Sequence, residues 1–135
     1  MTPSTIATVQ STWPAVAAIA PQAAALFYQN LFEADPKLKP LFKGDMAEQG
    51  NKLMQMLGLA VKGLSDVESL LPALHQLGEK HVDYGVKPEH YDTVGAALLK
   101  TLEQGLGDAF TPEVKTAWAE VYGAVATEMK AAAYA

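Results

Sequence analysis

The chain has 135 residues, half of them hydrophobic, and it contains no cysteine. This length is close to that of one domain, and a chain of this size buries roughly 70% of its unfolded surface, enough for a hydrophobic core. The absence of thiols excludes disulfides, zinc–cysteine sites, iron–sulfur clusters and a cysteine nucleophile. We therefore expect a single domain spanning residues 1–135.

The charge pattern argues against nucleic-acid and membrane partners. The net charge is −5 and all ten basic residues are lysines, so no guanidinium is present to bind phosphate in bidentate fashion. The first basic residue is Lys37, so no positively charged targeting segment precedes a hydrophobic run. The hydrophobic runs at 15–20 and 57–61 are far shorter than the ~20 residues of a membrane span. We expect a soluble, cytoplasmic protein.

Prolines, glycines and capping residues predict helices in the first half of the chain. The first helix is expected to begin at Ser4 or Thr5 and to bend at Pro14, and the second opens at Pro21. A short helical turn follows from Asp35–Pro36 to Phe42. Asp45 then caps a helix that ends at Gly63.

Three further helices are predicted in the second half. The first runs from Asp66 to Gly85, and the next opens at Pro88 and ends at Gly105–Gly107. The last begins at Thr111 and runs into an alanine-rich tail. Because no segment alternates with a period of two, we predict no strand. The fold class is all-α.

Three histidines are the first candidates for chemistry, at positions 75, 81 and 90. Their spacings of six and nine do not match the i, i+4 pair of a helical zinc site. The chain also has no Glu-x-x-His motif, no phosphate-binding glycine loop and no Gly-x-Ser-x-Gly elbow. His81 lies on the hydrophobic stripe of its helix with Leu77, so it is either a hydrogen-bonded core residue or a ligand. His75 and His90 are expected at the surface.

Two further polar residues interrupt hydrophobic stretches. Tyr28 follows Phe27, and Gln49 precedes Leu53 by four residues on the same helix face. Either hydroxyl or amide costs free energy if buried without a hydrogen bond. Tyr28 could bond a backbone carbonyl and Gln49 could lie at the surface, or both could face a ligand. Trp13 and Trp118 are expected to be core residues.

Together these segments resemble the bacterial single-domain globins, which are related to the haem domain of flavohaemoglobins and to Vitreoscilla-type haemoglobin. The first matching stretch is 27–32 with Pro36 and 41–42. The second is Lys80-His81, 85–86, 90–91 and 94–95, and the third is Trp118 with 121–123. The resemblance covers residues 4–129. It implies an all-α globin fold of the eight-helix type, with helices packed around one haem pocket.

The resemblance also implies a role for each matching residue. His81 corresponds to the proximal ligand of the iron in haem b (iron protoporphyrin IX), and Tyr28 and Gln49 correspond to the distal polar pair that stabilises a bound ligand. Lys52 could reach a haem propionate. The remaining cofactor-binding positions, all lining the pocket, are Phe42, Leu53, Met56, Leu77, Val86, Tyr91, Val94 and Leu98.

One departure from the family concerns the proximal side. Flavohaemoglobin-type domains carry a glutamate in the last helix that joins a tyrosine, here Tyr91, in bonding the proximal histidine. The corresponding position falls in 131–133, where this chain has alanines, and Glu128 is the nearest acid. Tyr91 could instead be a core aromatic with its hydroxyl at the pocket rim.

Three functions follow as alternatives. The first is a globin that reversibly binds dioxygen or nitric oxide with high affinity, for storage or scavenging, as a monomer or weak dimer. The second is the haem domain of a nitric oxide dioxygenase that depends on a separate reductase, since the chain ends without a flavin domain. The third is a haem-free helical interaction module in which His81, Tyr28 and Gln49 are core polar groups.

Overall fold

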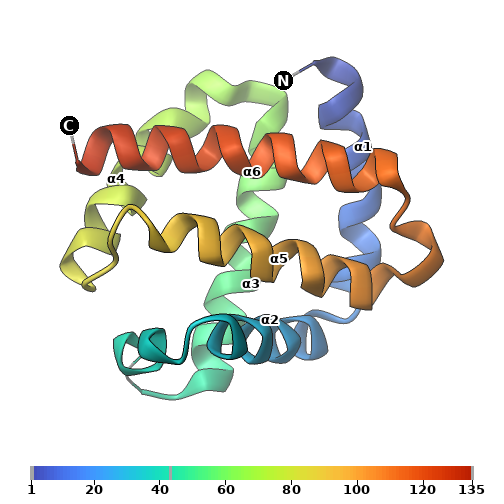
Figure 1. Cartoon of the computed structure of the whole chain (residues 1–135). Helices are drawn as coiled ribbons and strands as arrows, with labels where there is room; N and C mark the ends of the chain where they lie inside the picture. The colour runs from blue at the N-terminus through green and yellow to red at the C-terminus, as the bar shows by residue number, and fades with distance from the viewer. Residues whose placement is uncertain (1, 43, 135) are drawn as a thin grey trace.

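The computed structural model of the chain describes residues 2–42 and 44–134, and these form crossed helices (Figure 1). No strand is found within those two ranges. The elements, with η marking 3₁₀ helices, are α1 (Pro3–Ala17), α2 (Ala20–Ala34), η1 (Pro36–Leu41), α3 (Met46–Gly63), η2 (Leu64–Asp66), α4 (Val67–Asp83), α5 (His90–Leu106), η3 (Gly107–Ala109) and α6 (Pro112–Ala133). The predicted all-α class is confirmed.

The described residues contain six α-helices, the number that the caps and prolines predict, and this differs from the eight-helix type that the resemblance implies. One reason is the connection between α2 and α3, which carries Pro36 and Pro40 and forms the 3₁₀ helix η1. Proline lacks an N–H group and cannot continue a regular α-helical ladder, so this segment stays short.

Most predicted helix starts are correct because the capping side chains act as expected. Asp45 Oδ1 accepts from the Ala47 N–H at 2.8 Å, and Thr111 Oγ1 accepts from the Val114 N–H at 3.3 Å. Asp35 caps η1 through the N–H of Lys37.

Two predicted starts are wrong. The cap of α1 is Thr2, whose hydroxyl accepts from the Thr5 N–H, because Pro3 can occupy the first helical position. The helix α5 begins at His90 rather than at Pro88, because the Pro88 carbonyl accepts from Tyr91, three residues on, in a turn that precedes the α-helical ladder.

Two glycines allow the helices that surround the candidate site to approach closely. A Cβ at Gly50 of α3 would lie 2.9 Å from the Ala24 Cβ of α2, and a Cβ at Gly78 of α4 would collide with the backbone carbonyl of Met129 in α6. These contacts determine how near α3 lies to α2 and how near α4 lies to α6.

The hydrophobic core consists of two clusters. The larger cluster is centred on Val9, Leu31 and Leu102, and it joins α1, α2 and α5 to the rest of the bundle. The smaller cluster comprises Leu74, Tyr91, Ala126 and Met129 from α4, α5 and α6. Tyr122 and Val125 of α6 pack against both clusters. Trp118 is buried as predicted, and Trp13 is partly buried with its ring centroid 6.3 Å from that of Trp118.

None of the helices in the described ranges is long and hydrophobic enough to cross a membrane.

We predict that Gly78→Ala destabilises the protein by about 1–3 kcal/mol, because the new methyl group meets the Met129 backbone, which cannot rotate away. Gly123→Ala in α6 is the matched control, since no atom lies within 4 Å of its Cβ position and alanine favours a helix. The free energy of unfolding in urea measures both. Equal effects of the two substitutions would contradict the close approach of α4 and α6.

Candidate functional site

His81 lies in the last turn of α4 with one ring nitrogen already in use. Its Nδ1 is 2.7 Å from the backbone carbonyl oxygen of Leu77, one helical turn earlier. A carbonyl oxygen only accepts, so Nδ1 carries the proton and donates it. In the neutral imidazole, Nε2 then keeps its lone pair, which is the arrangement of most metal-binding histidines.

Two tyrosines flank the His81 ring. The ring centroids of Tyr84 and Tyr91 lie 5.9 Å and 6.3 Å from that of His81. Tyr91 is only 5% exposed, so it lies in the core, and its hydroxyl is not at the pocket rim as one of the two alternatives required. Among the described residues, the Tyr91 Oη is the buried side-chain atom without a hydrogen-bond partner. Burial, with a smaller contribution from Tyr134, raises the pKa of Tyr91.

Tyr28, the first predicted distal residue, lies among aromatic rings. Its ring centroid is 5.3 Å from those of Phe27 and Phe42 and 6.1 Å from that of Phe32. The residue is 9% exposed, and burial raises the pKa of its hydroxyl. Within the described ranges no hydrogen bond of this hydroxyl is found, so the backbone-carbonyl alternative for Tyr28 is wrong. The hydroxyl is a protonated donor in a hydrophobic setting.

Gln49 reaches the same region from α3. It is half-buried in the first turn of that helix, directly before Gly50. A Cβ at Gly50 would lie 3.9 Å from the Tyr28 ring. The helices α2 and α3 are therefore in contact at Tyr28 and next to Gln49, the two predicted distal residues. The close approach of α3 to α2 therefore places an amide and a phenol in one part of the molecule.

The predicted hydrophobic pocket residues divide between the two core clusters. Phe42, Leu53, Val94 and Leu98 belong to or pack against the larger cluster. Leu77, Val86 and Tyr91 belong to or pack against the smaller cluster. Most of these side chains are only partly buried, namely Phe42, Leu53, Leu77, Val86 and Val94. They leave apolar surface that a bound apolar group would cover.

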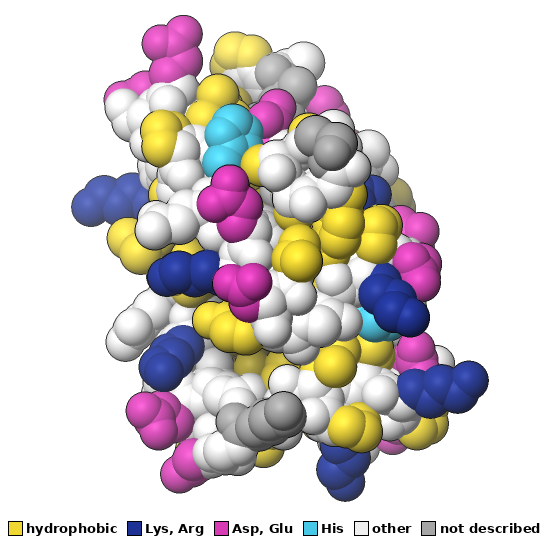
Figure 2. Space-filling view, turned by 90° about the vertical axis from the view of Figure 1, so that its left-hand side faces the viewer, with side chains coloured by type: hydrophobic (Ala, Val, Ile, Leu, Met, Phe, Trp, Pro, Cys, Tyr) yellow, Lys and Arg dark blue, Asp and Glu magenta, His cyan; other side chains and the backbone are white. Residues whose placement is uncertain are grey.

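Two predicted pocket residues, Lys52 and Met56, are exposed to solvent. The Lys52 side chain is 72% exposed, and its Nζ is 4.0 Å from Glu48 Oε1, a surface pair of little energetic value. Met56 is 39% exposed, whereas the nearby Met54 is buried. Figure 2 shows the face at the left of Figure 1, where hydrophobic side chains reach the surface between lysines and acids.

The other two histidines make structural contacts. His75, which was predicted at the surface, has a side chain that is 42% exposed, and its Nε2 is 3.0 Å from Glu128 Oε2, so it connects α4 to α6 there. The His90 Nδ1 accepts from the Lys87 N–H at 3.0 Å where α5 begins. In the described part of the chain, no three His, Cys, Asp or Glu residues form a metal-binding group.

One residue that contacts the segment after His81 was missed in the sequence analysis. Tyr134, at the end of α6, donates its hydroxyl hydrogen to the backbone carbonyl of Val86. It stands in an alanine-rich tail without a motif or helical periodicity that would single it out.

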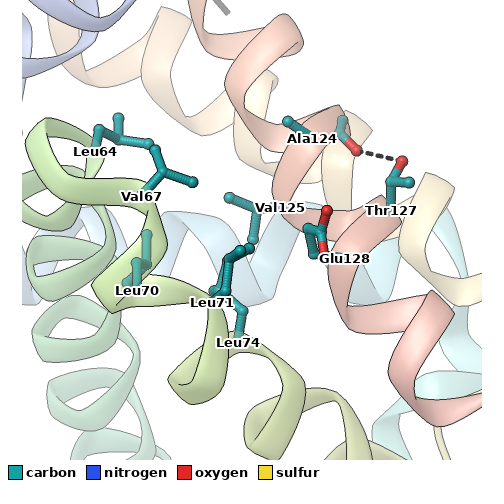
Figure 3. A pocket seen from close by; sticks show the side chains of 10 residues that line it. Leu64, Val67, Leu70, Leu71, Leu74, Ala124, Val125, Thr127 and Glu128 are labelled. Atoms are coloured by element: carbon teal, nitrogen blue, oxygen red, sulfur yellow. Dashed lines mark hydrogen bonds between the residues drawn. The ribbon is translucent and has the colours of Figure 1, made fainter.

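A groove of about 320 Å³ lies between α4 and α6 (Figure 3). Leucines 64, 70, 71 and 74 line one wall, with Val125 and Glu128 on the other. No residue of the predicted haem pocket lines this groove, so it is separate from the candidate site.

Comparison with known proteins decides the family. A model of the globin family matches residues 25–129. The chain belongs to the globin family. Globins bind haem, and the His81 arrangement agrees with that property.

Two curated relatives are both named flavohemoprotein. The one from Rhodopirellula baltica is 36% identical over 125 residues, covering 90% of this chain and 31% of the relative. The one from Xylella fastidiosa is 34% identical over 131 residues, covering 95% of this chain and 33% of the relative. The chain thus spans about a third of the length of the curated relatives it matches.

We predict that Tyr91→Phe stabilises the haem-free protein by about 1–2 kcal/mol, because it removes a buried hydroxyl that has no partner. Tyr122→Phe is the contrasting control. Its hydroxyl donates to the Tyr91 carbonyl at 2.6 Å, so its loss is expected to destabilise by about 1 kcal/mol. Urea unfolding of the haem-free variants measures both changes. A destabilised Tyr91→Phe variant would show that the hydroxyl has a partner.

Proposed function

We propose that this globin binds haem b through His81 and reversibly binds dioxygen on the side of Tyr28 and Gln49. The observation that carries the proposal is the hydrogen bond from His81 Nδ1 to the Leu77 carbonyl, which leaves the Nε2 lone pair of the neutral imidazole for a metal ion. When bound, the haem iron supplies one coordination position to the protein and one to a diatomic ligand.

The residues around His81 fit such a group. The partly buried side chains of Phe42, Leu53, Leu77, Val86 and Val94 offer a hydrophobic wall, with Leu98 behind them. The Tyr91 hydroxyl is buried without a partner beside the imidazole, as expected for a polar atom that a cofactor would satisfy. At the exposed edge, Lys52 would exchange its weak pairing with Glu48 for a propionate, and Met56 would cover the porphyrin.

Tyr28 and Gln49 would determine how long the ligand stays. The raised pKa of Tyr28 keeps its hydroxyl protonated at neutral pH, so it can donate a hydrogen bond. Donation to a ligand with partial negative charge contributes ~1.5–3 kcal/mol. This corresponds to roughly a 10- to 150-fold slower release per bond. The pocket therefore favours tight binding, suited to storage or scavenging.

The proximal side favours binding over redox chemistry. The His81 imidazole donates to a neutral carbonyl and not to a carboxylate, which would increase its electron donation to the iron. Glu128, the acid nearest in sequence to positions 131–133, is bonded to His75 instead. Residues 131–133 are alanines and offer no side-chain acceptor.

A nitric oxide dioxygenase haem domain is the second candidate, and the two relatives named flavohemoprotein favour it. It would require electrons from a reductase. Nitrate formation from nitric oxide, measured with and without an added reductase, distinguishes it from simple binding, because only the enzyme sustains many turnovers.

We predict that His81→Ala weakens haem binding by more than about 100-fold, because outer-shell partners of a metal ligand alone contribute roughly 10- to 100-fold. The Soret band of purified protein, titrated with haem, is the measurement. His75→Ala is the matched control on the same helix, since its ring bonds Glu128 and not the cofactor. A wild-type protein that folds but binds no haem would favour the interaction-module alternative.

Tyr28→Phe is expected to accelerate oxygen dissociation by roughly 10- to 150-fold, and more than Gln49→Leu does. The phenylalanine keeps the packing against Phe27 and Phe42 and removes only the donor. Stopped-flow displacement of oxygen by carbon monoxide gives the rate. Unchanged rates in both variants would refute the distal assignment.

A further inference from the structure

A polar cluster inside the core joins α2, the helix that carries Tyr28, to α5. The Asn30 Nδ2 group donates one hydrogen to Thr101 Oγ1 at 3.0 Å and the other to Gln104 Oε1 at 2.9 Å. The Thr101 hydroxyl donates in turn to the Ala97 carbonyl at 2.8 Å. Asn30 and Thr101 are only 5% and 4% exposed, so a polar link lies where the surrounding contacts are hydrophobic.

Thr101 lies on the side of α5 that bears two predicted pocket residues. Val94, Leu98 and Thr101 follow one another at spacings of four and three, which place them on one face of a helix. Leu98 is buried, and Val94 packs against the larger core cluster. Asn30 therefore connects the helix of Tyr28 to the face of α5 that carries part of the predicted hydrophobic wall.

The two bonds of the Asn30 amide fix the orientation of α2 on α5. Their acceptors, Thr101 and Gln104, are one helical turn apart, so α2 can neither rotate about its axis nor slide along α5 without losing a bond. Hydrophobic contacts are non-directional and do not set such a register. A further link between the two helices, from Lys100 Nζ to Glu33 Oε2 at 3.9 Å, is exposed and of little energetic value.

Tyr28 lies on the other side of α2 from Asn30. Two residues along a helix correspond to a rotation of about 200°. The Tyr28 ring accordingly faces Gly50 of α3 and the Phe42 ring. Any rotation of α2 that breaks the Asn30 bonds also swings the Tyr28 hydroxyl about the same axis. Because a hydrogen bond weakens steeply as its angle departs from linearity, such a rotation would impair donation to a ligand.

We propose that Asn30 is a positioning residue for the distal donor: by fixing the rotation and register of α2 on α5, it holds the Tyr28 hydroxyl where a bound ligand can accept its hydrogen. This inference rests on the proposed role of Tyr28 in ligand binding. Asn30 acts through Tyr28 and not on the ligand itself.

The first test compares Asn30→Leu with Gln29→Met. Leucine keeps nearly the shape of asparagine and removes both donors. The control removes the neighbouring amide of α2, whose Nε2 is 3.4 Å from Glu33 Oε1 of the same helix at the surface. We expect Asn30→Leu to accelerate oxygen dissociation by about 2- to 13-fold, the factor that corresponds to one net hydrogen bond. Gln29→Met is expected to keep the wild-type rate.

A double variant distinguishes positioning from a general structural effect. In a Tyr28→Phe background the donor is already absent, so Asn30→Leu is expected to cause no further acceleration of oxygen dissociation. If Asn30 affected the pocket independently of Tyr28, the two factors would multiply.

A second measurement does not require the cofactor. The ring protons of Tyr28 lie among three phenylalanine rings, so their NMR chemical shifts in the haem-free protein report the orientation of α2. Asn30→Leu and Thr101→Val, which removes one acceptor, are both expected to move these resonances. Thr101→Ser, which keeps the hydroxyl, and Gln29→Met are expected to leave them at the wild-type positions.

Three outcomes would overturn the proposal. One is a wild-type oxygen dissociation rate in both Asn30→Leu and Thr101→Val while Tyr28→Phe is accelerated, which would leave the proposed haem function intact. Another is an equal effect of Gln29→Met. The third is a multiplied effect in the double variant. An unchanged rate in Tyr28→Phe would refute the distal assignment itself, and the role of Asn30 with it.

Discussion

The close approach of α4 to α6 at Gly78 is the constraint on which the candidate site depends. Because position 78 has no side chain, α4 lies against the Met129 backbone, and His81 follows one turn later. The smaller core cluster forms around this crossing and contains Tyr91. A comparable contact at Gly50 brings α3 to α2 and places Gln49 near Tyr28. Two glycines thus determine the positions of both predicted sides of the pocket.

Polar groups near the pocket are held in two different ways. The His81 Nδ1 is satisfied by its own helix and the Tyr122 hydroxyl by the Tyr91 backbone, so these groups are fixed before any ligand arrives. The Tyr91 hydroxyl is buried without a hydrogen-bond partner, and no hydrogen bond of the Tyr28 hydroxyl to another described residue is found. Buried donors of this kind cost stability in the haem-free protein. That cost is recovered only if a cofactor or ligand accepts their hydrogens.

The proximal side of the candidate site lacks a carboxylate on the last helix near the C-terminus. Alanines at 131–133 remove the carboxylate, and Glu128 pairs with His75. A neutral carbonyl on the imidazole supports binding of a ligand better than its reduction. In place of a charged contact, α6 reaches the histidine segment through Tyr134 and the Val86 backbone.

The sequence by itself determined the helical class, most helix boundaries and the family, because caps such as Asp45 and Thr111 act locally and the motif around His81 is contiguous. It left open whether the Tyr91 hydroxyl lies at the pocket rim, and it predicted His75 at the surface without identifying its partner Glu128. The burial of Tyr91 and the pairing of His75 with Glu128 depend on how α6 packs across α4 and α5, which no local pattern encodes. The Tyr134–Val86 bond is likewise decided by tertiary structure alone, because it joins residues 48 positions apart.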